Sequence, residues 1–354
     1  MVGEMINEVK NASVPIFQVD PYWPKPLPNN WILGQVCGVA VDSHDNVWII
    51  QRPRSLTDRE AGAVQVPPLS ECCVPAPSVI GFDPEGFVIE AWGGPGDLAN
   101  QPWPEVEHGI FVDHESNVWT TFMGKTDHVV FKSTREGHRL LTIGQLGATG
   151  GSNHQEMLGQ PADIAVDAEE NEAYIADGYG NRRVIVFDAS TGIYKRHWGA
   201  YGNRPHDDEL GSYDPDAEIS GSFRQPMHAV RIANDRLVYT ADRMNNRIQV
   251  FRPDGTFLKE AFIATRTLAM GSVWDLEFSC DDDQTFVFVP DGTNQKVWIL
   301  NRIDLEIVGF FGRGGKQAGY FGWVHSLASD SQGNIYTGEV ETGKRIQRFI
   351  PAKS

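Results

Sequence analysis

Three histidines occupy the same place in a repeated stretch of this sequence, and together they could bind a metal ion. Six short apolar stretches, each following a turn, align as Cys37–Asp42, His108–Asp113, Ala162–Asp167, His228–Ala233, Trp274–Ser279 and His325–Asp330. If six copies close into a ring, His108, His228 and His325 lie at alternate positions and converge on the axis. Three converging imidazoles are the protein part of a catalytic zinc site, and iron or copper also accept them.

The alternative for each histidine is ordinary packing, because a single histidine in a strand usually has a satisfied place in the core. The other three copies begin with Cys37, Ala162 and Trp274. Histidine at every second position of a closed ring favours a shared role as metal ligands over three separate packing roles.

Two arginines could bind an anion beside this metal. Arg52 and Arg243 come directly after the second strand of their copies, which places them at the same face of the ring as the histidines. A guanidinium can hold a carboxylate with two parallel hydrogen bonds. The alternative for each arginine is a structural salt bridge between neighbouring copies.

Tyr179 lies between two glycines, Gly178 and Gly180. Glycine tolerates unusual backbone angles and leaves room around the ring, so this turn could project Tyr179 into the mouth of the channel. The alternative is a hydrophobic cap on the turn. Asp177 and Asp242, at matching positions after the second strands, are expected to hold their turns through hydrogen bonds.

Short strands must position these residues. Each copy has an apolar strand ending near Asp, a turn, a second strand such as Asn46–Ile50, a third such as Arg183–Phe187, and often a fourth ending in Trp-Gly or Phe-Gly. Strands rich in Val, Ile and aromatics between Asp, Asn and Gly turns indicate antiparallel hairpins. A four-stranded propeller blade takes roughly 40–50 residues, and the longer spacings between these copies hold insertions. We therefore predict an all-β, six-bladed β-propeller with four antiparallel strands per blade.

The predicted organisation is an N-terminal segment, residues 1–34, followed by the propeller, residues 35–350. The segment contains one strand, Pro15–Asp20. We expect it to complete the last blade and so remove an open sheet edge.

Three insertions lengthen the repeat, at residues 53–78, 144–160 and 199–223. Long insertions in a compact repeat are usually functional, so we expect them to wall one mouth of the channel. The alternative is that they are disordered surface loops.

Composition limits the partners of this 354-residue chain. The net charge of −17 argues against a nucleic-acid or anionic-membrane surface. We expect a small-molecule substrate and a monomer. The N-terminus has no basic start and no apolar run, so the chain as given is expected to be cytoplasmic, or secreted or periplasmic if a leader was removed.

The four cysteines do not form an evident disulfide framework. Cys72 and Cys73 are adjacent, and neighbours rarely bridge each other, so packing within the first insertion is expected for both. A second metal or a redox role is the alternative.

The repeat resembles the NHL-type six-bladed propellers, and within that group the peptidyl-α-hydroxyglycine α-amidating lyases. The resemblance covers roughly residues 35–350. It rests on Gly34–Asp42, His108–Asp113, Gln160–Asp167, Ala176–Arg182, Ala241–Gln249 and Trp323–His325.

The resemblance implies a zinc-dependent lyase in which the base beside the metal is Tyr179. These lyases also hold calcium in the channel, partly through an Asp that follows the third histidine. Ser326 stands there in this chain, which leaves calcium in doubt although the carbonyls of Val39 and Ile110 remain. Gly180 replaces a cysteine that these lyases have after the tyrosine.

Three functions follow from these observations. The first is a metal-dependent lyase acting on a small hydroxylated, anionic substrate, with Arg52 and Arg243 holding the anionic group. The second is a metal-dependent, lactonase-like hydrolase, although gluconolactonase-type propellers use carboxylate and Asn ligands that are not found here. The third is a non-catalytic NHL-repeat binding scaffold, which would need no histidine triad.

Overall fold

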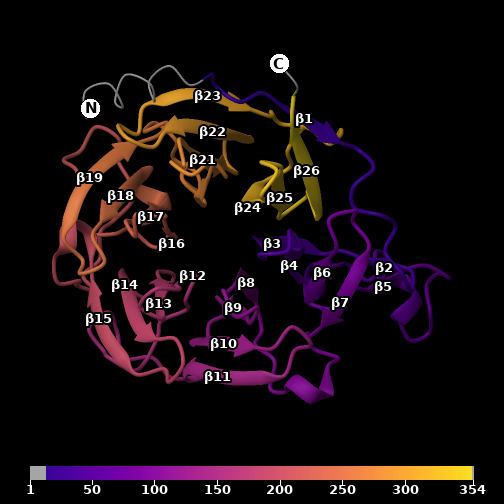
Figure 1. Cartoon of the computed structure of the whole chain (residues 1–354). Helices are drawn as coiled ribbons and strands as arrows, with labels where there is room; N and C mark the ends of the chain where they lie inside the picture. The colour runs from indigo at the N-terminus through magenta and orange to yellow at the C-terminus, as the bar shows by residue number, and fades with distance from the viewer. Residues whose placement is uncertain (1–12, 353–354) are drawn as a thin grey trace.

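The computed structural model describes residues 13–352, and its strands form six four-stranded antiparallel sheets arranged in a ring (Figure 1). The first three blades run β3 (Gln35–Val41), β4 (Val47–Arg52), β6 (Val79–Phe82), β7 (Val88–Trp92); β8 (Glu107–Val112), β9 (Val118–Phe122), β10 (Val129–Ser133), β11 (Arg139–Gly144); and β12 (Asp163–Asp167), β13 (Glu172–Asp177), β14 (Arg183–Asp188), β15 (Tyr194–Trp198).

The last three blades run β16 (Met227–Ile232), β17 (Val238–Asp242), β18 (Arg247–Phe251), β19 (Phe257–Phe262); β20 (Glu277–Phe278), β21 (Phe286–Asp291), β22 (Lys296–Asn301), β23 (Ile307–Phe311); and β24 (Val324–Ser329), β25 (Ile335–Glu339), β26 (Arg345–Pro351), β1 (Phe17–Asp20). Short 3-10 turns are η1 (Pro53–Ser55), η2 (Gly62–Val64), η3 (Leu98–Asn100), η4 (Ala200–Gly202) and η5 (Arg243–Asn245). The predicted six-bladed, all-β propeller is confirmed.

The N-terminal strand closes the ring as expected. β1 lies antiparallel to β26, with Phe17 opposite Pro351 and Asp20 opposite Arg348. The side chains of Arg348 and Asp20 also form an ion pair at 2.5 Å. This pairing covers the edge of the last blade. Part of the predicted N-terminal segment, residues 1–12, lies outside the described residues.

Aspartate fixes the turn after the first strand in several blades. Asp42 accepts hydrogen bonds from the backbone N–H groups of His44 and Asn46, at 2.9 and 3.0 Å. Its other oxygen accepts a bond from Trp48 Nε1 at 3.1 Å. Asp113 and Asp330 repeat this arrangement. In these three blades the Asp at the end of the apolar stretch thus sets the hairpin and anchors a buried aromatic ring.

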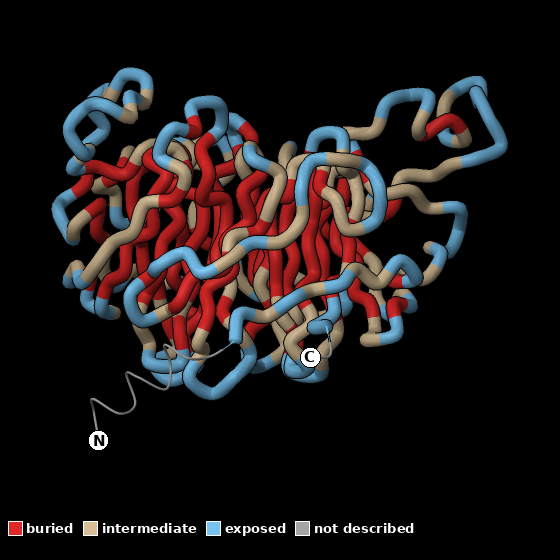
Figure 2. The backbone as a smooth tube through the Cα atoms, turned by 90° about the horizontal axis from the view of Figure 1, so that it is seen from above, coloured by how far each residue is buried: buried red, intermediate tan, exposed pale blue. Residues whose placement is uncertain are grey.

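The core lies within and between the blades, where apolar side chains from neighbouring sheets meet. Figure 2 shows buried backbone along the strands and exposed backbone in the loops at both faces. Trp48 and Trp119 are fully buried in equivalent places of the first two blades. Packing of this kind holds the six first strands around the axis, which is the geometry that the site requires.

The fifth blade has a shorter first strand than predicted. The aligned stretch begins at Trp274, but β20 contains only Glu277 and Phe278. Asp275 Oδ1 accepts the N–H of Leu276 at 2.8 Å, and Glu277 Oε1 accepts the N–H of Phe278 at 2.9 Å. Side-chain bonds to the local backbone therefore compete with the sheet ladder at this point.

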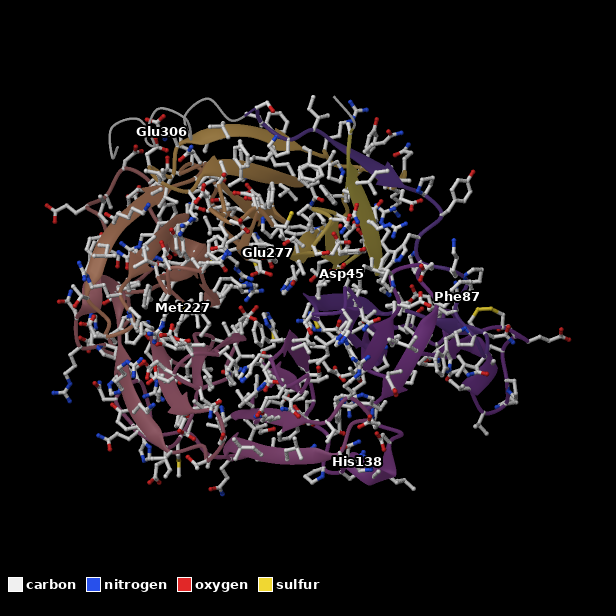
Figure 3. All side chains as sticks on the ribbon, viewed as in Figure 1. Asp45, Phe87, His138, Met227, Glu277 and Glu306 are labelled. Atoms are coloured by element: carbon white, nitrogen blue, oxygen red, sulfur yellow. A yellow bond between two sulfur atoms is a disulfide. The ribbon has the colours of Figure 1, made fainter. Side chains whose placement is uncertain are left out.

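The expectation for Cys72 and Cys73 was wrong, because their sulfur atoms form a disulfide. Figure 3 shows the bond within the loop at the right of the ring. In the same insertion, β5 (Val74–Pro75) pairs in parallel with β2 (Trp31–Ile32). The expectation rested only on how rarely adjacent cysteines form a disulfide, whereas the fold of this insertion brings the two sulfur atoms together.

The first two insertions make specific contacts with the blades. Lys344 donates to Ser55 O at 3.0 Å and pairs with Glu60 at 2.8 Å, which fastens the first insertion to the last blade. Arg183 donates to the carbonyls of Ser152 and Met157 and so holds the second. Within residues 13–352, no helix is both long and apolar enough to cross a membrane.

Candidate metal centre and active site

A β-bulge turns each of the three histidines toward the axis. The register of β8, β16 and β24 slips against β9, β17 and β25 at His108, His228 and His325 respectively. β3 has the same irregularity at Cys37. A bulge places an extra residue on one strand and re-aims its side chain, often beside an active site. The aligned position is therefore special in backbone geometry as well as in residue type.

The three imidazoles converge as predicted. Their candidate ligand atoms all lie within 4.8 Å of one another. His108, His228 and His325 are 2%, 2% and 3% exposed. A cavity of about 10 Å³ lies among them and the first residues of the other three copies. That is room for one occupant the size of a water molecule or an ion.

Backbone carbonyls of the blades that lie between the histidine blades fix which nitrogen His108 and His228 present to the axis. His108 Nδ1–H donates to Ala162 O at 2.6 Å, and His228 Nδ1–H donates to Trp274 O. His325 faces the backbone of Cys37 in the same way, although its Nδ1 makes no hydrogen bond of ordinary geometry. Because a carbonyl can only accept, the proton of His108 and of His228 stays on Nδ1, and Nε2 of each keeps its lone pair. Nε2 of His228 is buried without a partner.

Burial and arginine charge keep the imidazoles neutral. Burial lowers the pKa of His108, His228 and His325 well below its usual range, and the charge of Arg243 acts in the same direction on all three. The charge of Arg52 further lowers the pKa of His108 and His325. A metal ligand must be deprotonated, so these histidines form a ready donor set at neutral pH.

The structure brings Tyr179 to the triad. Its hydroxyl lies 3.0 Å from His108 Nε2 and donates to it, since the proton of that imidazole is on Nδ1. Arg243 Nη1 donates to the same hydroxyl at 3.4 Å. A cap on the turn would not place its polar atom on a buried imidazole, so the hydroxyl is suited to move a proton at the centre.

A buried aspartate holds the Tyr179 turn in place. Asp177 accepts the N–H of Gly159 at 2.7 Å and the Nε–H of Arg183 at 2.9 Å, and both charged side chains are fully buried. Gly178 packs so closely that a Cβ there would lie 1.8 Å from the carbonyl oxygen of Met227. The turn therefore requires glycine on the N-terminal side of Tyr179.

Arg243 lies between the tyrosine and an aromatic wall. It is 3% exposed, and its guanidinium lies 4.4 Å from the ring centre of Trp274. Among residues 13–352 it forms no ion pair, and its Nε is buried without a partner. Burial lowers its pKa. A desolvated cation without a counter-ion is a suitable place for a substrate anion.

Arg52 lies nearby and bridges the first and second blades. Its Nε donates to Glu107 O at 2.8 Å and its Nη1 donates to Gln35 Oε1 at 2.8 Å. It also forms no ion pair in the described part of the chain. The alternative of structural salt bridges for Arg52 and Arg243 therefore finds no support here. Both charges reach the triad, as their effect on its pKa values shows.

Below the triad the channel has a different character, which the sequence reasoning missed. Arg231 forms ion pairs with Asp163 and with Asp275, the latter at 2.8 Å. Asp275 also accepts the hydroxyl of Ser326 at 2.9 Å, and that hydroxyl accepts the N–H of Val39 at 3.1 Å. Asp163, Asp275 and Ser326 are the second residues of the aligned copies, so the same alignment contained the signal. With Arg231 and Val39 they couple five blades immediately beneath the histidines.

A second cavity continues the channel beyond this ion pair network. It measures about 230 Å³ and is lined by first strands, including residues Val39, Ile110 and Ala165. Arg231 and Glu277 are its charged groups. Figure 3 shows Glu277 close to the centre of the ring. Burial raises the pKa of Glu277 to about 7, against the opposing effect of the Arg231 charge.

Comparison with known proteins identifies homologues of this chain. No family model matches. The chain is 26% identical to peptidyl-glycine alpha-amidating monooxygenase B of Xenopus laevis, over 98% of this chain and 37% of that protein. It is 26% identical to peptidyl-alpha-hydroxyglycine alpha-amidating lyase 1 of Drosophila melanogaster, over 93% and 58%. It is 27% identical to NHL repeat-containing protein 3 of Mus musculus, over 95% and 85%.

These matches confirm the resemblance to the amidating lyases and NHL-repeat proteins. The chain spans about a third of the length of the amidating monooxygenases that it matches. Among solved structures, a streptogramin B lyase has a TM-score of 0.52 at 14% identity, covering 96% of this chain and 88% of that one. That likeness supports the propeller fold alone.

Proposed function

We propose that this homologue of the amidating lyases is a metal-dependent lyase that acts on a small hydroxylated substrate with an anionic group. The observation that carries the proposal is the Tyr179 hydroxyl placed 3.0 Å from Nε2 of one histidine in a converging triad. A binding scaffold has no need for this arrangement, although the likeness to NHL repeat-containing protein 3 keeps a non-catalytic role as the competing hypothesis.

The residues fit a transition metal. Neutral ring nitrogens of His108, His228 and His325 would hold it, and three imidazoles with an open position suit catalytic zinc, while iron or copper would also accept them. His108 Nε2 has one lone pair, so a bound metal would replace the Tyr179 hydrogen bond there and leave that hydroxyl beside the metal. Calcium fits poorly, because the nearby carboxylates of Asp163 and Asp275 already share the charge of Arg231. When bound, zinc would supply Lewis-acid chemistry that lowers the pKa of a substrate hydroxyl or a water.

The chain's own residues then account for the proton and the anion. Tyr179 would relay the proton: its hydroxyl gives a proton to the departing nitrogen as it takes the proton of the substrate hydroxyl, and it ends the step as it began. In a carbinolamide, the O–H electrons form the new C=O bond, the C–N bond breaks, and the nitrogen takes the proton to become an amide. The products are an amide and an aldehyde acid. Arg52 and Arg243 would hold the acid group throughout.

A hydrolase that uses a metal-activated water, of the lactonase type, is the second candidate. It needs the same triad and does not need Tyr179 to act on the substrate hydroxyl. Substrate class separates the two candidates: α-hydroxyglycine derivatives test the lyase, and lactones test the hydrolase.

Metal content and turnover test the proposal together. The purified protein should hold about one transition metal per chain and convert an N-acyl-α-hydroxyglycine to an amide. Replacing His228 by Ala removes one of three ligands, so metal affinity should fall by more than the roughly 10–100-fold typical of losing a supporting contact, and turnover should fall to background.

The matched control is His138→Ala, because His138 is an exposed histidine at the rim of the ring (Figure 3). It should keep both metal and activity. Elemental analysis that finds no zinc, iron or copper in protein prepared without chelators would remove the enzyme hypothesis and leave the scaffold.

A further inference from the structure

A cleft lined by two arginines lies beside the Tyr179 turn. It has a volume of about 480 Å³, and its wall includes Arg182, Arg224 and Met244. Met244 directly follows Arg243 in the chain. Gln225, which also lines the cleft, donates from Nε2 to Gly180 O at 2.8 Å. The cleft therefore adjoins the mouth at which Tyr179 and Arg243 meet the triad.

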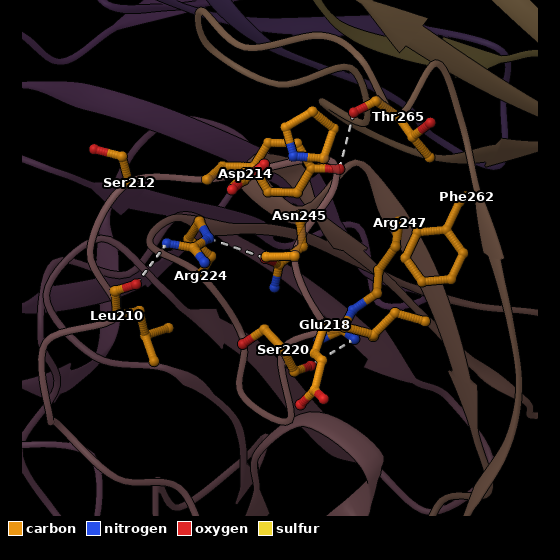
Figure 4. A pocket seen from close by; sticks show the side chains of 14 residues that line it. Leu210, Ser212, Asp214, Glu218, Ser220, Arg224, Asn245, Arg247, Phe262 and Thr265 are labelled. Atoms are coloured by element: carbon orange, nitrogen blue, oxygen red, sulfur yellow. Dashed lines mark hydrogen bonds between the residues drawn. The ribbon is translucent and has the colours of Figure 1, made fainter.

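The insertion at residues 199–223 forms the outer wall of this cleft. A second pocket of about 490 Å³ continues from it and shares Leu210, Ser212, Tyr213 and Arg224. Figure 4 shows this second pocket, with Arg224 bonded to Asn245 on one side and to the insertion on the other. Together the two hollows form an extended recess that the blades alone would not make.

Neither arginine has a carboxylate partner within residues 13–352. Arg182 is 7% exposed and donates from Nη1 to the carbonyls of His206 and Asp208, while its Nε is buried without a partner. Arg224 donates to Asn245 Oδ1 at 3.0 Å and to Gly211 O at 2.6 Å. Carbonyl oxygens satisfy hydrogen bonds but carry no full negative charge. The Asp242 carboxylate acts on Arg224 from a distance and accepts its backbone N–H, not its guanidinium.

The cleft concentrates this charge. None of the residues that line the 480 Å³ cleft is acidic, although the chain as a whole carries a net charge of −17. Burial lowers the pKa of Arg224, and the nearby charge of Arg182 acts in the same direction, against the opposing charge of Asp242. Two partly desolvated guanidinium groups that repel each other are stabilised when an anion binds between them. Apolar side chains, Leu210, Met244 and Leu268, complete the lining.

We propose that this cleft binds a second carboxylate of the substrate, joined to the reacting end through an apolar segment. Arg182 and Arg224 recognise the carboxylate, and the apolar wall contacts the linker. Arg243 and Arg52 hold the acid group at the metal, so a substrate with two anionic ends would span the distance between the two sites. The inference rests on the proposed lyase function for its kinetic test and on binding alone for its second test.

The competing explanation is that both arginines only anchor the insertion through its carbonyls. The kinetic test compares two substrates of equal length, N-hexanoyl-α-hydroxyglycine and its counterpart with a terminal carboxylate on the acyl chain. Wild-type protein should have a kcat/KM about 10–100-fold higher for the dicarboxylate, the range expected for a charge-assisted hydrogen bond to a buried cation.

Arg224→Gln should reduce that ratio to near one, and Arg224→Lys should leave part of it. The matched control is Arg266→Gln, which removes another arginine contact to the same insertion, the pair with Asp216, without touching the cleft. The control should keep the full ratio. Equal kcat/KM for the two substrates in wild-type protein, or an unchanged ratio in Arg224→Gln, overturns the inference.

The second test can be made even if neither substrate reacts. That result would count against the lyase function and not against binding in the cleft. Adipate should then raise the melting temperature of the metal-loaded protein more than hexanoate does at the same concentration and ionic strength. The difference should vanish in Arg224→Gln and remain in Arg266→Gln. Equal shifts by the two acids in the wild-type protein would show that the arginines serve only to anchor the insertion.

Discussion

The two halves of the axial channel both contain buried arginine, but they use it in opposite ways. Below the triad, Arg231 lies between Asp163 and Asp275, and these carboxylates raise its pKa. Above the triad, Arg243 forms no ion pair within residues 13–352, and burial lowers its pKa. The lower charge is compensated by neighbouring carboxylates, whereas the upper charge has no such partner in that part of the chain.

This difference separates structure from function at neighbouring levels of one channel. A compensated ion pair that couples several blades is costly to break and does nothing for a ligand. An uncompensated cation is costly to keep, so its presence beside Tyr179 and the histidines calls for a functional reason. The comparison predicts that mutations in the lower half change stability and that mutations in the upper half change binding and turnover.

The largest expected effect is on turnover and comes from the upper half. Tyr179→Phe removes only the hydroxyl and keeps the ring against His108 and His228. If Tyr179 carries the proton, turnover of an α-hydroxyglycine derivative should fall roughly 10²–10⁴-fold with metal content unchanged. The measurements are steady-state kinetics and elemental analysis on the same preparation.

A Tyr179→Phe protein that stays active would remove the phenol from the mechanism. That outcome favours a metal-activated water as the base, which is the chemistry of the hydrolase candidate. An unchanged melting temperature is the control in either case, because the hydroxyl has no structural partner in the described chain besides His108 and Arg243.

The next effect is a loss of stability from the lower half. Arg231→Met leaves Asp163 and Asp275 without their shared cation, and removing one partner of a buried ion pair costs about 3–5 kcal/mol. Arg243→Met removes a cation that has no counter-ion, so we expect the free energy of unfolding to change by less than about 1 kcal/mol. Denaturant midpoints of the two variants give a direct comparison.

The effects of the two variants on substrate binding should be in the opposite order to their effects on stability. Arg243→Met should raise KM for an anionic substrate, while the fraction of Arg231→Met that is folded should keep the KM of the wild type. Equal losses of stability in the two variants would show that the halves of the channel do not differ as their charges suggest.

The sequence predicted those parts of the site that depend on the repeat. Aligning the copies placed His108, His228 and His325 around one axis, because equivalent residues of a closed ring must face the same way. Tyr179 and Arg243 could be assigned to the same face for the same reason. Contacts that cross from blade to blade, such as the carbonyl of Ala162 on His108, follow only once the ring has closed.

Other features lay beyond that reasoning for specific physical causes. The bulges at the histidines are departures from regular strand pairing, and no residue type in the sequence predicts them. The role of Arg231 depends on two aspartates from other blades that meet it at the axis. The Cys72–Cys73 disulfide contradicts a rule drawn from what is usual for adjacent cysteines. The arginine cleft needed the position of residues 199–223, which the sequence marked only as an insertion.

The smallest expected effect is a pH dependence of stability that comes from Glu277 in the lower cavity. Its folded-state pKa is raised to about 7. Arg231, Asp275 and Ser329 surround it: the charge of Arg231 and a hydrogen bond with Ser329 lower the pKa, and the charge of Asp275 raises it. The folded protein therefore holds a proton that the unfolded chain has already lost between the ordinary glutamate pKa and about 7. Stability from this group should fall as the pH rises through that window.

A shift of this size sets an upper limit of about 3 kcal/mol, but Glu277 faces an open cavity in which water screens its charge, so we expect about 1 kcal/mol. The measurement is the denaturant midpoint at pH 5 and pH 8 for wild type and Glu277→Gln. The glutamine variant cannot ionise, so it should lose this part of the pH dependence and gain stability relative to wild type at pH 8. Asp275 and Asp163 also have raised pKa values, and their contribution remains in both proteins, which makes the difference between the two specific to Glu277. Parallel curves for the two proteins would mean that the lower cavity is wet enough to leave the carboxylate charged, and the lower half would then hold a net negative charge facing the positive half above.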